Sequence, residues 1–492
     1  MVRISKECIK CKRCVSECSF GALRFGEDRV VADHEKCVAC HRCTSVCPVM
    51  AITVTQFPFA LKENSLWRPD IMRNLWRQAA SGAKILTGGG NDKPYPVYWD
   101  RMLLDACQVT NPSIDPLREP MELRTYIGKK PEKLEFWQDK SGEIKVTTVL
   151  EPQIKLETPI VFAGMSFGAI SLNAQLVLAK AAAALGTVMN TGEGGLPQEL
   201  RPYKDHIVVQ CASGRFGVNL DYLNSCAAIE IKIGQGAKPG IGGHLPGEKV
   251  TEDIARTRMI PPGTDAISPA PHHDIYSIED LRQLIYALKE ATRYKKPVGV
   301  KIAAVHNVAA IASGVVRAGA DILTIDGFRG GTGAAPQAIR DHVGIPIELA
   351  LARVDEQLRK EGIRHQASVI ASGGIRQSVD VVKAIALGAD AVAIGTAALV
   401  AMGCHLCQKC HTGLCAWGIA TQRPELVKRL DVEEGTQRLI NMVKAWNLEI
   451  KEILGALGVN SIESLRGNRE RLRGVDLDQL YLDILGIKPA GK

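Results

Sequence analysis

The chain has 492 residues, of which 46% are hydrophobic and 23% charged, and its formal net charge is +8. This length corresponds to about two to four domains, and the composition is that of an ordinary globular protein with a full core. The positive charge is spread along the chain without a basic stripe, so we expect no nucleic-acid partner. No apolar run reaches the length of about 18 residues that a membrane-spanning helix needs. Fifteen cysteines without a secretory signal favour a reducing, cytoplasmic location and metal centres.

Two cysteine runs of the same spacing open the chain: Cys8-x2-Cys11-x2-Cys14-x3-Cys18 and Cys37-x2-Cys40-x2-Cys43-x3-Cys47. This spacing is typical of two-cluster ferredoxins, in which the last cysteine of each run binds the cluster of the other run. The predicted ligand sets are therefore Cys8, Cys11, Cys14 and Cys47 for one [4Fe–4S] cluster, and Cys37, Cys40, Cys43 and Cys18 for the other. Disulfides and paired zinc sites are the alternatives, and neither explains this spacing. We predict an α+β ferredoxin domain over residues 1–56.

Residues 57–151 are less regular, and we interpret them as a linking and covering segment. From there apolar, strand-like stretches recur at 160–163, 187–189, 207–209, 228–231, 298–302, 322–325, 368–371 and 391–394. Helical patterns separate most of them, at 173–185, 278–294, 307–318, 346–361 and 378–387. This alternation predicts an α/β domain at 152–417 with a (β/α)8 TIM-type barrel, and an open doubly wound sheet is the alternative. The Gly- and Pro-rich insertion at 234–277 is expected to be a substrate lid, and residues 418–492 a helical extension.

Glycine turns follow the two last predicted strands, at Gly373-Gly374 and at Gly395-Thr396. Phosphate sites of such barrels commonly lie after strands seven and eight, where backbone N–H groups are free, so flavin mononucleotide (FMN) is the expected ligand. Gly331 and Gly333 after the sixth strand predict a further close approach of the backbone. Lys301 on the fifth strand is expected to face the barrel mouth and to stabilise negative charge on a reduced flavin, and a simple ion pair is the alternative.

A third cysteine group follows the eighth strand: Cys404-x2-Cys407-x2-Cys410-x4-Cys415. Its position predicts a metal centre within electron-transfer range of the flavin. Zinc is the alternative, although the spacing is not that of a paired zinc ribbon.

Several motifs resemble the FMN-binding synthase region of the glutamate synthase family, in particular that of the split, archaeal-type members with a fused ferredoxin. They begin at Gly164-Met165-Ser166-Phe167-Gly168, Asn190-Thr191-Gly192-Glu193, Ser213-Gly214-Arg215, Gln235-Gly236-Ala237-Lys238, Ser268-Pro269-Ala270 and Gly330-Gly331-Thr332-Gly333. The resemblance implies reduction of 2-iminoglutarate, formed from 2-oxoglutarate and ammonia, by hydride from FMN, with electrons delivered through the clusters. It implies that Lys238 and Arg258 hold the 2-oxoglutarate carboxylates and that Glu193 lies near the reacting carbon. The implied FMN contacts are Met165, Ser166, Asn190, Gln210, Lys301, Gly331, Gly333, Gly373, Gly374, Gly395 and Thr396.

Three departures from the family pattern matter. His244 stands where the family often has Gln. The family holds a [3Fe–4S] centre on cysteines that match Cys404, Cys410 and Cys415, so the resemblance favours a [3Fe–4S] centre here. The additional Cys407 would permit a [4Fe–4S] centre as the alternative. Nothing resembles the amidotransferase domain or a G-x-G-x-x-G dinucleotide fingerprint. We therefore expect a separate glutaminase subunit, and an NAD(P)H-oxidising subunit or a ferredoxin as electron donor.

Two other readings remain at this point. A subunit of methylamine–glutamate N-methyltransferase has a similar barrel, but that reaction needs no outside electrons and the fused ferredoxin argues against it. A non-catalytic electron-transfer subunit is the second alternative, and the carboxylate-binding set at Glu193, Lys238 and Arg258 argues against it.

Overall fold

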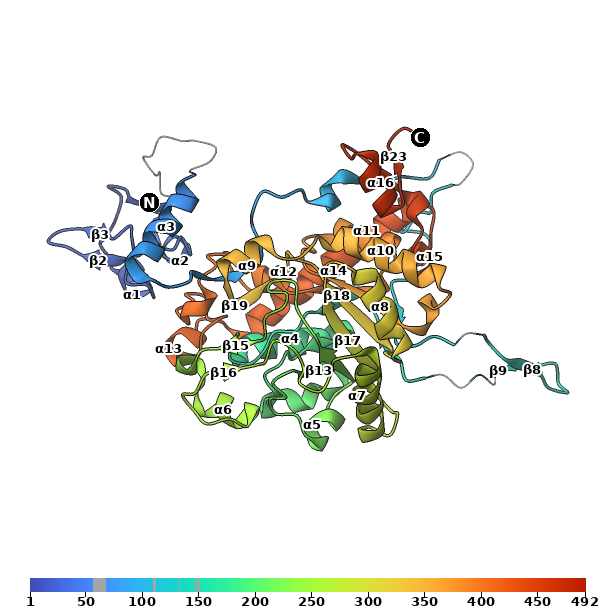
Figure 1. The fold of residues 1–492 in the computed structure, drawn as a ribbon. Coiled ribbons are helices and arrows are strands. Elements are labelled where there is room, and N and C mark those ends of the chain that lie inside the picture. The colour runs from blue at the N-terminus through green and yellow to red at the C-terminus, as the bar shows by residue number, and fades with distance from the viewer. Residues whose placement is uncertain (56–67, 109–111, 132, 147, 149–150) are drawn as a thin grey trace.

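A computed structural model describes residues 1–55, 68–108, 112–131, 133–146, 148 and 151–492. A small N-terminal unit lies at one side of a large barrel, and a thin β-hairpin projects from the opposite side (Figure 1). Parts of the predicted covering segment at 57–151 fall outside the described residues, namely 57–67, 109–111, 132, 147 and 149–150. In the described part of the chain, no helix is both long and apolar enough to cross a membrane.

Eight parallel strands form a closed barrel in the order β11-β12-β13-β14-β17-β18-β20-β21. The ring closes because β21 pairs with β11, with Ile160 opposite Val392. The predicted (β/α)8 barrel is thus confirmed, and the open sheet is wrong. The strands are β11 (Ile160–Phe162), β12 (Met189–Asn190), β13 (Ile207–Ala212), β14 (Ala228–Lys232), β17 (Val298–Ala303), β18 (Ile322–Asp326), β20 (Ser368–Ser372) and β21 (Ala391–Ile394).

Helices cover the outside of this ring. The main ones are α4 (Leu172–Leu185), α7 (Ile278–Ala291), α8 (Val308–Arg317), α10 (Ile347–Lys360) and α11 (Ser378–Leu387), each within a few residues of its predicted range. Two of them begin at a serine cap: Ser171 accepts from the Ala174 amide and Ser277 from the Asp280 amide. Such a cap stabilises a helix by about 1 kcal/mol.

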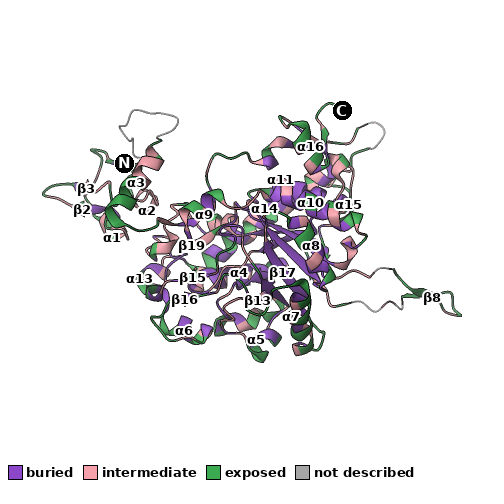
Figure 2. Ribbon diagram, viewed as in Figure 1, coloured by how far each residue is buried: buried purple, intermediate pink, exposed green. Residues whose placement is uncertain are grey.

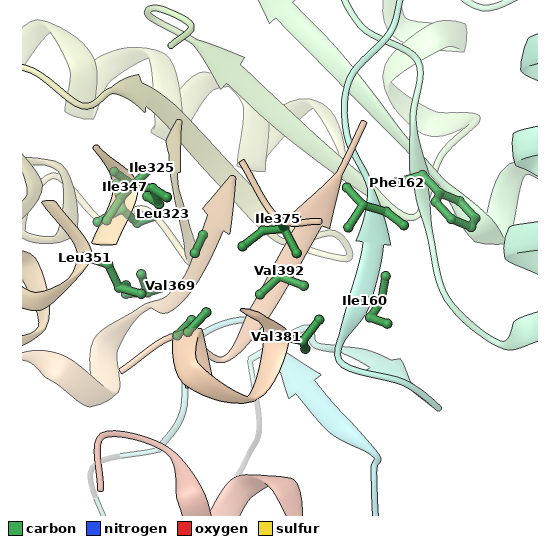
Figure 3. Close-up of a cluster of buried hydrophobic side chains, with 14 of the residues drawn as sticks. Ile160, Phe162, Leu323, Ile325, Ile347, Leu351, Val369, Ile375, Val381 and Val392 are labelled. Carbon is green, nitrogen blue, oxygen red and sulfur yellow. The ribbon is translucent and has the colours of Figure 1, made fainter. Parts of the chain in front are cut away.

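Alternate strand residues point outward and pack on these helices. In Figure 3, Leu323 and Ile325 of β18 lie beside Ile347 and Leu351 of α10, and Val392 of β21 lies above Val381 of α11. Burial of each such side chain contributes about 1.5–3 kcal/mol. The strands are accordingly buried along their length (Figure 2).

The amino ends of the barrel strands are covered by a two-stranded sheet, β7 (Thr125–Ile127) with β10 (Ile154–Leu156). Ile127 packs against the inward residues Val161, Ile322 and Ile370. A functional site is therefore expected at the carboxyl ends, as in other barrels of this type.

The N-terminal unit contains two short antiparallel pairs, β1 (Val2–Ile4) with β4 (Ile52–Val54) and β2 (Leu23–Phe25) with β3 (Val30–Ala32). Two one-turn helices, α1 (Arg13–Ser16) and α2 (Arg42–Ser45), each carry a cysteine. Its small core combines Val2, Leu23, Val30 and Ile52 with cysteines of both runs. This is the predicted α+β ferredoxin arrangement.

The remaining elements connect and cover these parts. The linking segment carries α3 (Pro69–Ser81), β5 (Leu86–Gly89), η1 (Tyr98–Arg101), β6 (Met102–Leu104), and the projecting hairpin of β8 (Phe136–Gln138) and β9 (Ile144–Val146). Barrel loops contain η2 (Gln198–His206), α5 (Leu220–Asn224), β19 (Thr332–Pro336), α9 (Gln337–His342), η4 (Arg364–Gln366), α12 (Thr396–Ala401) and η5 (Cys410–Thr412).

The chain end is not purely helical. It contains α13 (Pro424–Val427), α14 (Val432–Ala456), α15 (Ile462–Leu465), η6 (Arg469–Arg471) and α16 (Gln479–Leu485). It also contains β22 (Leu472–Gly474) and β23 (Lys488–Pro489), which form a sheet with β6 of the linking segment. The linking segment and the C-terminal extension are therefore tied together.

Candidate functional site

A buried carboxylate stands at the centre of the barrel mouth. Glu230 of β14 accepts hydrogen bonds from Asn190 Nδ2 at 2.9 Å, Gln210 Nε2 at 2.7 Å and Thr324 Oγ1 at 3.0 Å. The four residues come from four different strands. Glu230 thus fixes the orientation of two amides, Asn190 and Gln210, that the sequence motifs single out.

Glu193 lies in the loop after β12, among cations. Lys232 Nζ is 3.3 Å from Glu193 Oε1, and Ser268 Oγ donates to Oε2 at 3.2 Å. Burial alone would raise the pKa of Glu193, but the charges of Lys232, Lys238 and Arg258 together hold that pKa below its ordinary value. The carboxyl group is therefore an anion in a positively charged pocket.

Lys238 and Arg258 are carried by the predicted lid, which contains β15 (His244–Leu245), η3 (Gly247–Lys249), α6 (Glu252–Arg258) and β16 (Ala266–Ile267). Both are almost fully buried, with 4% and 3% of their surface exposed. Lys238 Nζ donates to Ala334 O at 3.1 Å, and Arg258 donates to Phe167 O at 2.9 Å and Ser166 Oγ at 3.3 Å. Arg258 Nε is buried and has no hydrogen-bond partner in the part of the chain that the structure describes.

Burial lowers the pKa of Lys238 to about 8, and the neighbouring Lys232 acts in the same direction. Burial also lowers the pKa of Arg258. Among the described residues, neither cation has a carboxylate within ion-pair distance, and the nearby Glu193 pairs with Lys232. The lid approaches the same place closely: a Cβ placed on Gly243 would lie 1.7 Å from Glu193 Oε1.

His244 is directed elsewhere. Its side chain is 41% exposed, and Nε2 lies 3.5 Å from Asp265 Oδ2 on the lid surface. The described contacts of His244 thus connect two parts of the lid to each other.

The predicted phosphate-binding glycines lie where backbone segments come close together. A Cβ on Gly331 would lie 3.0 Å from Thr396 Oγ1, and one on Gly373 would lie 2.5 Å from the Gly327 carbonyl. Gly373 and Gly374 have φ values of 93° and 105°, which few residues other than glycine adopt. A Cβ on Gly395 would lie 3.5 Å from Ala163 Cβ and one on Gly333 would lie 3.2 Å from Ala169 Cβ, so both are close to the β11 loop.

Lys301 of β17 is 6% exposed and points to Asp326 of β18, with 3.8 Å between Nζ and Oδ2. Asp326 also accepts from Ser372 Oγ at 2.9 Å and from the Gly236 amide at 2.8 Å. A cavity in the barrel is lined by Lys301, Asn190, Gly164 and Ser372 at its mouth. Met165 lies beside this mouth, where its carbonyl accepts from Gln175 at 2.8 Å.

The ferredoxin cysteines gather in the predicted sets. The pKa of Cys14 is raised by burial and then by the charges of Cys8, Cys11 and Cys47. Burial likewise raises the pKa of Cys40, and the charges of Cys18, Cys37 and Cys415 add to this. The last cysteine of each run therefore lies beside the other run, as the spacing predicts.

The third cysteine group also converges. Burial raises the pKa of Cys404 and Cys410 to about 11, and in both cases the Cys415 charge adds to the effect. Burial raises the pKa of Cys407 to about 12, with further contributions from Cys410 and Cys415. In the described part of the chain, no three His, Cys, Asp or Glu side chains are arranged to share a single metal ion.

A buried lysine of the lid touches this group. Lys249 is 6% exposed, and its Nζ donates to Cys410 O at 2.7 Å. Burial lowers the pKa of Lys249, and the thiolate charges of Cys410 and Cys415 oppose that effect. The same insertion thus carries Lys238 and Arg258 at the barrel mouth and Lys249 at the cysteines.

Strand β5 links the cysteine group to the glycine loop. Thr332 of β19 pairs with Gly89, and the Gly88 amide donates to Gln408 O at 2.9 Å. Arg340, which is 2% exposed, donates to Gly88 O and to Gln408 Oε1, both at 2.9 Å. This position gives the linking segment a structural role at the site.

The ferredoxin unit docks on the third cysteine group. Trp417 Nε1 donates to Cys40 O at 2.9 Å, Arg429 donates to Glu17 O at 3.0 Å, and Ser19 Oγ donates to Leu414 O at 2.8 Å. The Trp417 ring also stacks on His405, with 4.3 Å between the ring centres. The end of the first run, at Glu17 and Ser19, and Cys40 of the second run therefore both face the barrel.

Sequence reasoning missed Glu230, Lys232, Lys249 and Arg340. Each is a charged residue that the structure buries against groups far away along the chain, and charged residues are normally exposed. A polar residue inside an apolar strand pattern, as at Glu230 and Lys232, was the one available signal.

Comparisons with known proteins agree with this geometry. The family model described as "Conserved region in glutamate synthase" matches residues 93–460, and that described as "4Fe-4S dicluster domain" matches residues 7–51. An archaeal-type glutamate synthase (NADPH) of Thermotoga maritima is 64% identical over 488 residues, which cover 99% of this chain and 96% of that protein. An archaeal glutamate synthase (NADPH) of Methanocaldococcus jannaschii is 63% identical, with 99% and 96% covered.

The large chain of glutamate synthase (NADPH) of Azospirillum brasilense is 41% identical over 379 residues, which cover 76% of this chain and 24% of that protein. The similarity to the archaeal-type proteins thus extends over the ferredoxin unit and the barrel together. With its cation-lined barrel mouth and its cysteine sets, this chain belongs to the glutamate synthase family.

Proposed function

We propose that this chain is the synthase subunit of a glutamate synthase, which reductively aminates 2-oxoglutarate to L-glutamate in the cytoplasm. The observation that carries the proposal is the pocket of Lys232, Lys238 and Arg258 around Glu193. A dianionic 2-oxo acid requires cations that are not already neutralised, and Lys238 and Arg258 have no carboxylate within ion-pair distance in the described part of the chain. The relatives' names support the same activity.

Lys238 and Arg258 would bind the two carboxylates of 2-oxoglutarate. Arg258 is suited to one of them because its Nε is buried and unpartnered, while Phe167 O and Ser166 Oγ hold its other end. Glu193, an anion in this pocket, would accept an N–H of ammonia or of the imine and orient it. Closure of the lid over these groups would exclude water.

The barrel mouth fits FMN. The phosphate would lie on backbone N–H groups at Gly331, Gly333, Gly373, Gly374, Gly395 and Thr396. At several of these positions a Cβ would occupy the space beside the backbone that the phosphate needs. Met165, Ser166, Asn190, Gln210 and Lys301 would contact the ring system, with both amides oriented by Glu230. When bound, FMN supplies the hydride that reduces the imine. Lys301 would then place a positive charge beside the ring.

The cysteine sets fit iron–sulfur clusters that supply single electrons to the flavin. Cys8, Cys11, Cys14 and Cys47 would hold one [4Fe–4S] cluster, and Cys37, Cys40, Cys43 and Cys18 a second. The group from Cys404 to Cys415 would hold a third centre. Ammonia would come from a separate glutaminase subunit, and electrons from an NADPH-oxidising subunit or a ferredoxin.

One assay tests the proposal. The reconstituted chain, supplied anaerobically with 2-oxoglutarate, ammonium and a reduced low-potential donor, should form L-glutamate. Glutamine in place of ammonium should not support the reaction unless a glutaminase is added. Lys238→Met should abolish glutamate formation while the flavin spectrum persists. Glutamate formation from glutamine by the isolated chain, or full activity of Lys238→Met, would overturn the proposal.

A further inference from the structure

The two ferredoxin runs share an uncommon backbone conformation. In each run, the residues just before and just after the second cysteine have positive φ values. They are Lys10 (58°) and Lys12 (61°) around Cys11, and Ala39 (52°) and His41 (58°) around Cys40. Such values are uncommon for residues other than glycine and require an explanation in each case. The thiols around these residues are neighbours, since Cys8 and Cys11 act electrostatically on Cys14, and Cys37 acts on Cys40.

The third cysteine group repeats this conformation. Leu406 (52°) and Gln408 (58°) flank Cys407 in the same way. A left-handed conformation costs about 1–2 kcal/mol per residue, and neither leucine nor glutamine favours it. Strained backbone of this kind persists where the surroundings impose it, and it gathers at functional sites. The x2-x2 spacing is therefore accompanied by the same local fold.

The turn after the fourth cysteine is repeated as well. The amide three residues after that cysteine donates to its carbonyl in all three groups: Gly21 to Cys18 at 3.0 Å, Met50 to Cys47 at 3.3 Å and Gly418 to Cys415 at 3.3 Å. The donor residue has a positive φ each time, at 61°, 50° and 75°. The spacing between Cys410 and Cys415 is one residue longer than in the ferredoxin runs, and this extra residue lies before the turn and leaves the turn unchanged.

The four thiols of the third group are mutual neighbours. Cys415 acts electrostatically on Cys404, Cys407 and Cys410, so it belongs to the same set as those three. Cys407 does not point away to solvent, because it is partly buried and interacts with Cys410 and Cys415. A three-iron centre would leave this thiol without a metal.

We propose that Cys404, Cys407, Cys410 and Cys415 form a four-thiolate site for a third [4Fe–4S] cubane, in which Cys407 is a ligand. The inference rests on the proposed function only for the presence of an iron–sulfur centre in this group. It differs from the three-cysteine pattern that the family resemblance implies. The geometry that carries it is the repetition, around Cys407, of the loop that surrounds Cys11 and Cys40.

The experiment compares Cys407→Ala with its structural counterpart Cys11→Ala in the reconstituted full chain. Iron content and electron paramagnetic resonance are measured on the oxidised protein. The unaltered chain should hold about twelve irons. It should show no three-iron signal, since oxidised [4Fe–4S] clusters give no electron paramagnetic resonance signal. Each variant should lose about one iron and gain the signal of an oxidised [3Fe–4S] centre at about one spin per chain. Cys107→Ala, outside all three groups, should match the unaltered chain.

Several results decide the matter. Loss of the whole third centre from Cys407→Ala, with the ferredoxin signals and the flavin spectrum intact, would also support ligation by Cys407. A three-iron signal in the unaltered chain that Cys407→Ala leaves unchanged would overturn the proposal. Zinc at one equivalent, with iron enough for only two clusters, would overturn it too. None of these readouts depends on glutamate formation, so failure of the proposed function would be recognised separately.

Discussion

Among single residues, Lys238 has an unusual environment for a lysine. It is buried at the barrel mouth next to another cation, Lys232, and its pKa falls to about 8. A lysine in this range is protonated at neutral pH but close to losing its charge. The carboxylate binding proposed for Lys238 should therefore depend on pH within the physiological range.

We expect the affinity for 2-oxoglutarate to fall as the pH rises from 7 to 9.5. In the proposed function the protonated form of Lys238 would bind the carboxylate, so above the pKa of about 8 the apparent Kd should rise about tenfold per pH unit. Bound substrate moves the transition upward by linkage. Titration of the flavin spectrum with 2-oxoglutarate measures the effect. In Lys238→Arg the dependence should disappear over this window, and a slope unchanged in that variant would contradict the assignment.

Lys249 is a second buried cation with a specific neighbour, the third cysteine group. Reduction of an iron–sulfur centre adds one negative charge, which a nearby ammonium stabilises. We expect Lys249→Met to lower the midpoint potential of the third centre by about 59 mV or more, which is tenfold in a one-electron equilibrium. A redox titration followed by paramagnetic resonance measures this shift.

Two controls accompany the Lys249 variant. Lys249→Arg retains the charge and should shift the potential much less. Lys383→Met removes a buried lysine that donates to Trp99 O at 2.7 Å, away from the cysteines, and should leave the potential unchanged. An equal shift in all three variants would show that packing, not charge, sets the potential.

Among elements, β5 is a short strand that contacts two parts of the candidate site. It pairs with β19 on one side and contacts the third cysteine group on the other, so it spaces that group from the glycine loop. Gly88 is at the closest point: a Cβ there would lie 2.7 Å from Cys410 Cβ and 3.0 Å from Cys410 Sγ. The Cys410 side chain, with its backbone N at 3.2 Å from the same position, leaves no room for a Cβ.

Gly88→Ala should therefore disturb the third centre selectively. Overpacking of this kind costs about 1–3 kcal/mol and displaces the Cys410 thiol. We expect iron to be lost from the third centre while the two ferredoxin clusters stay at full occupancy in the same sample. Iron analysis and paramagnetic resonance of the reduced protein measure this, and full retention of all three centres would show that the loop adapts.

The elements also show what sequence can predict. The barrel followed from strand and helix periodicity because its eight strands are buried on both faces and read as largely apolar runs. The cysteine sets followed from spacing, because the spacing of cysteines that are close in sequence predicts which thiols can lie close together in space. Glu230 and Lys249 could not be found in this way, since their partners lie on other strands and on a loop about 160 residues away. The pairing of β5 with β19 is likewise a long-range contact.

At the scale of the whole molecule, the described contacts that hold the ferredoxin unit include hydrogen bonds and an ion pair. Removal of one such bond costs about 1 kcal/mol. Trp417→Phe would keep the stack on His405 but lose the bond to Cys40 O, and Arg429→Gln would lose the ion pair with Glu17. Together the two changes should loosen the unit without altering its own fold.

Hydrogen exchange of residues 412–418 should accelerate in the doubly substituted chain, by about tenfold or more if the two losses add. The exchange of β1 and β4 inside the unit should not change. Trp446→Phe, on α14 within the main core, serves as a control that should leave residues 412–418 unaffected. Equal protection in the double variant and the unaltered chain would mean that other contacts hold the unit.

The docking bonds end on backbone groups of the cysteine runs, at Cys40 O and Glu17 O, and on Leu414 O next to Cys415. We expect the iron ligands to hold these groups in place, and metal loading and docking would then favour each other by the same free energy. A chain whose clusters are destroyed by oxygen would consequently release its N-terminal unit and expose the face around Trp417 to proteases.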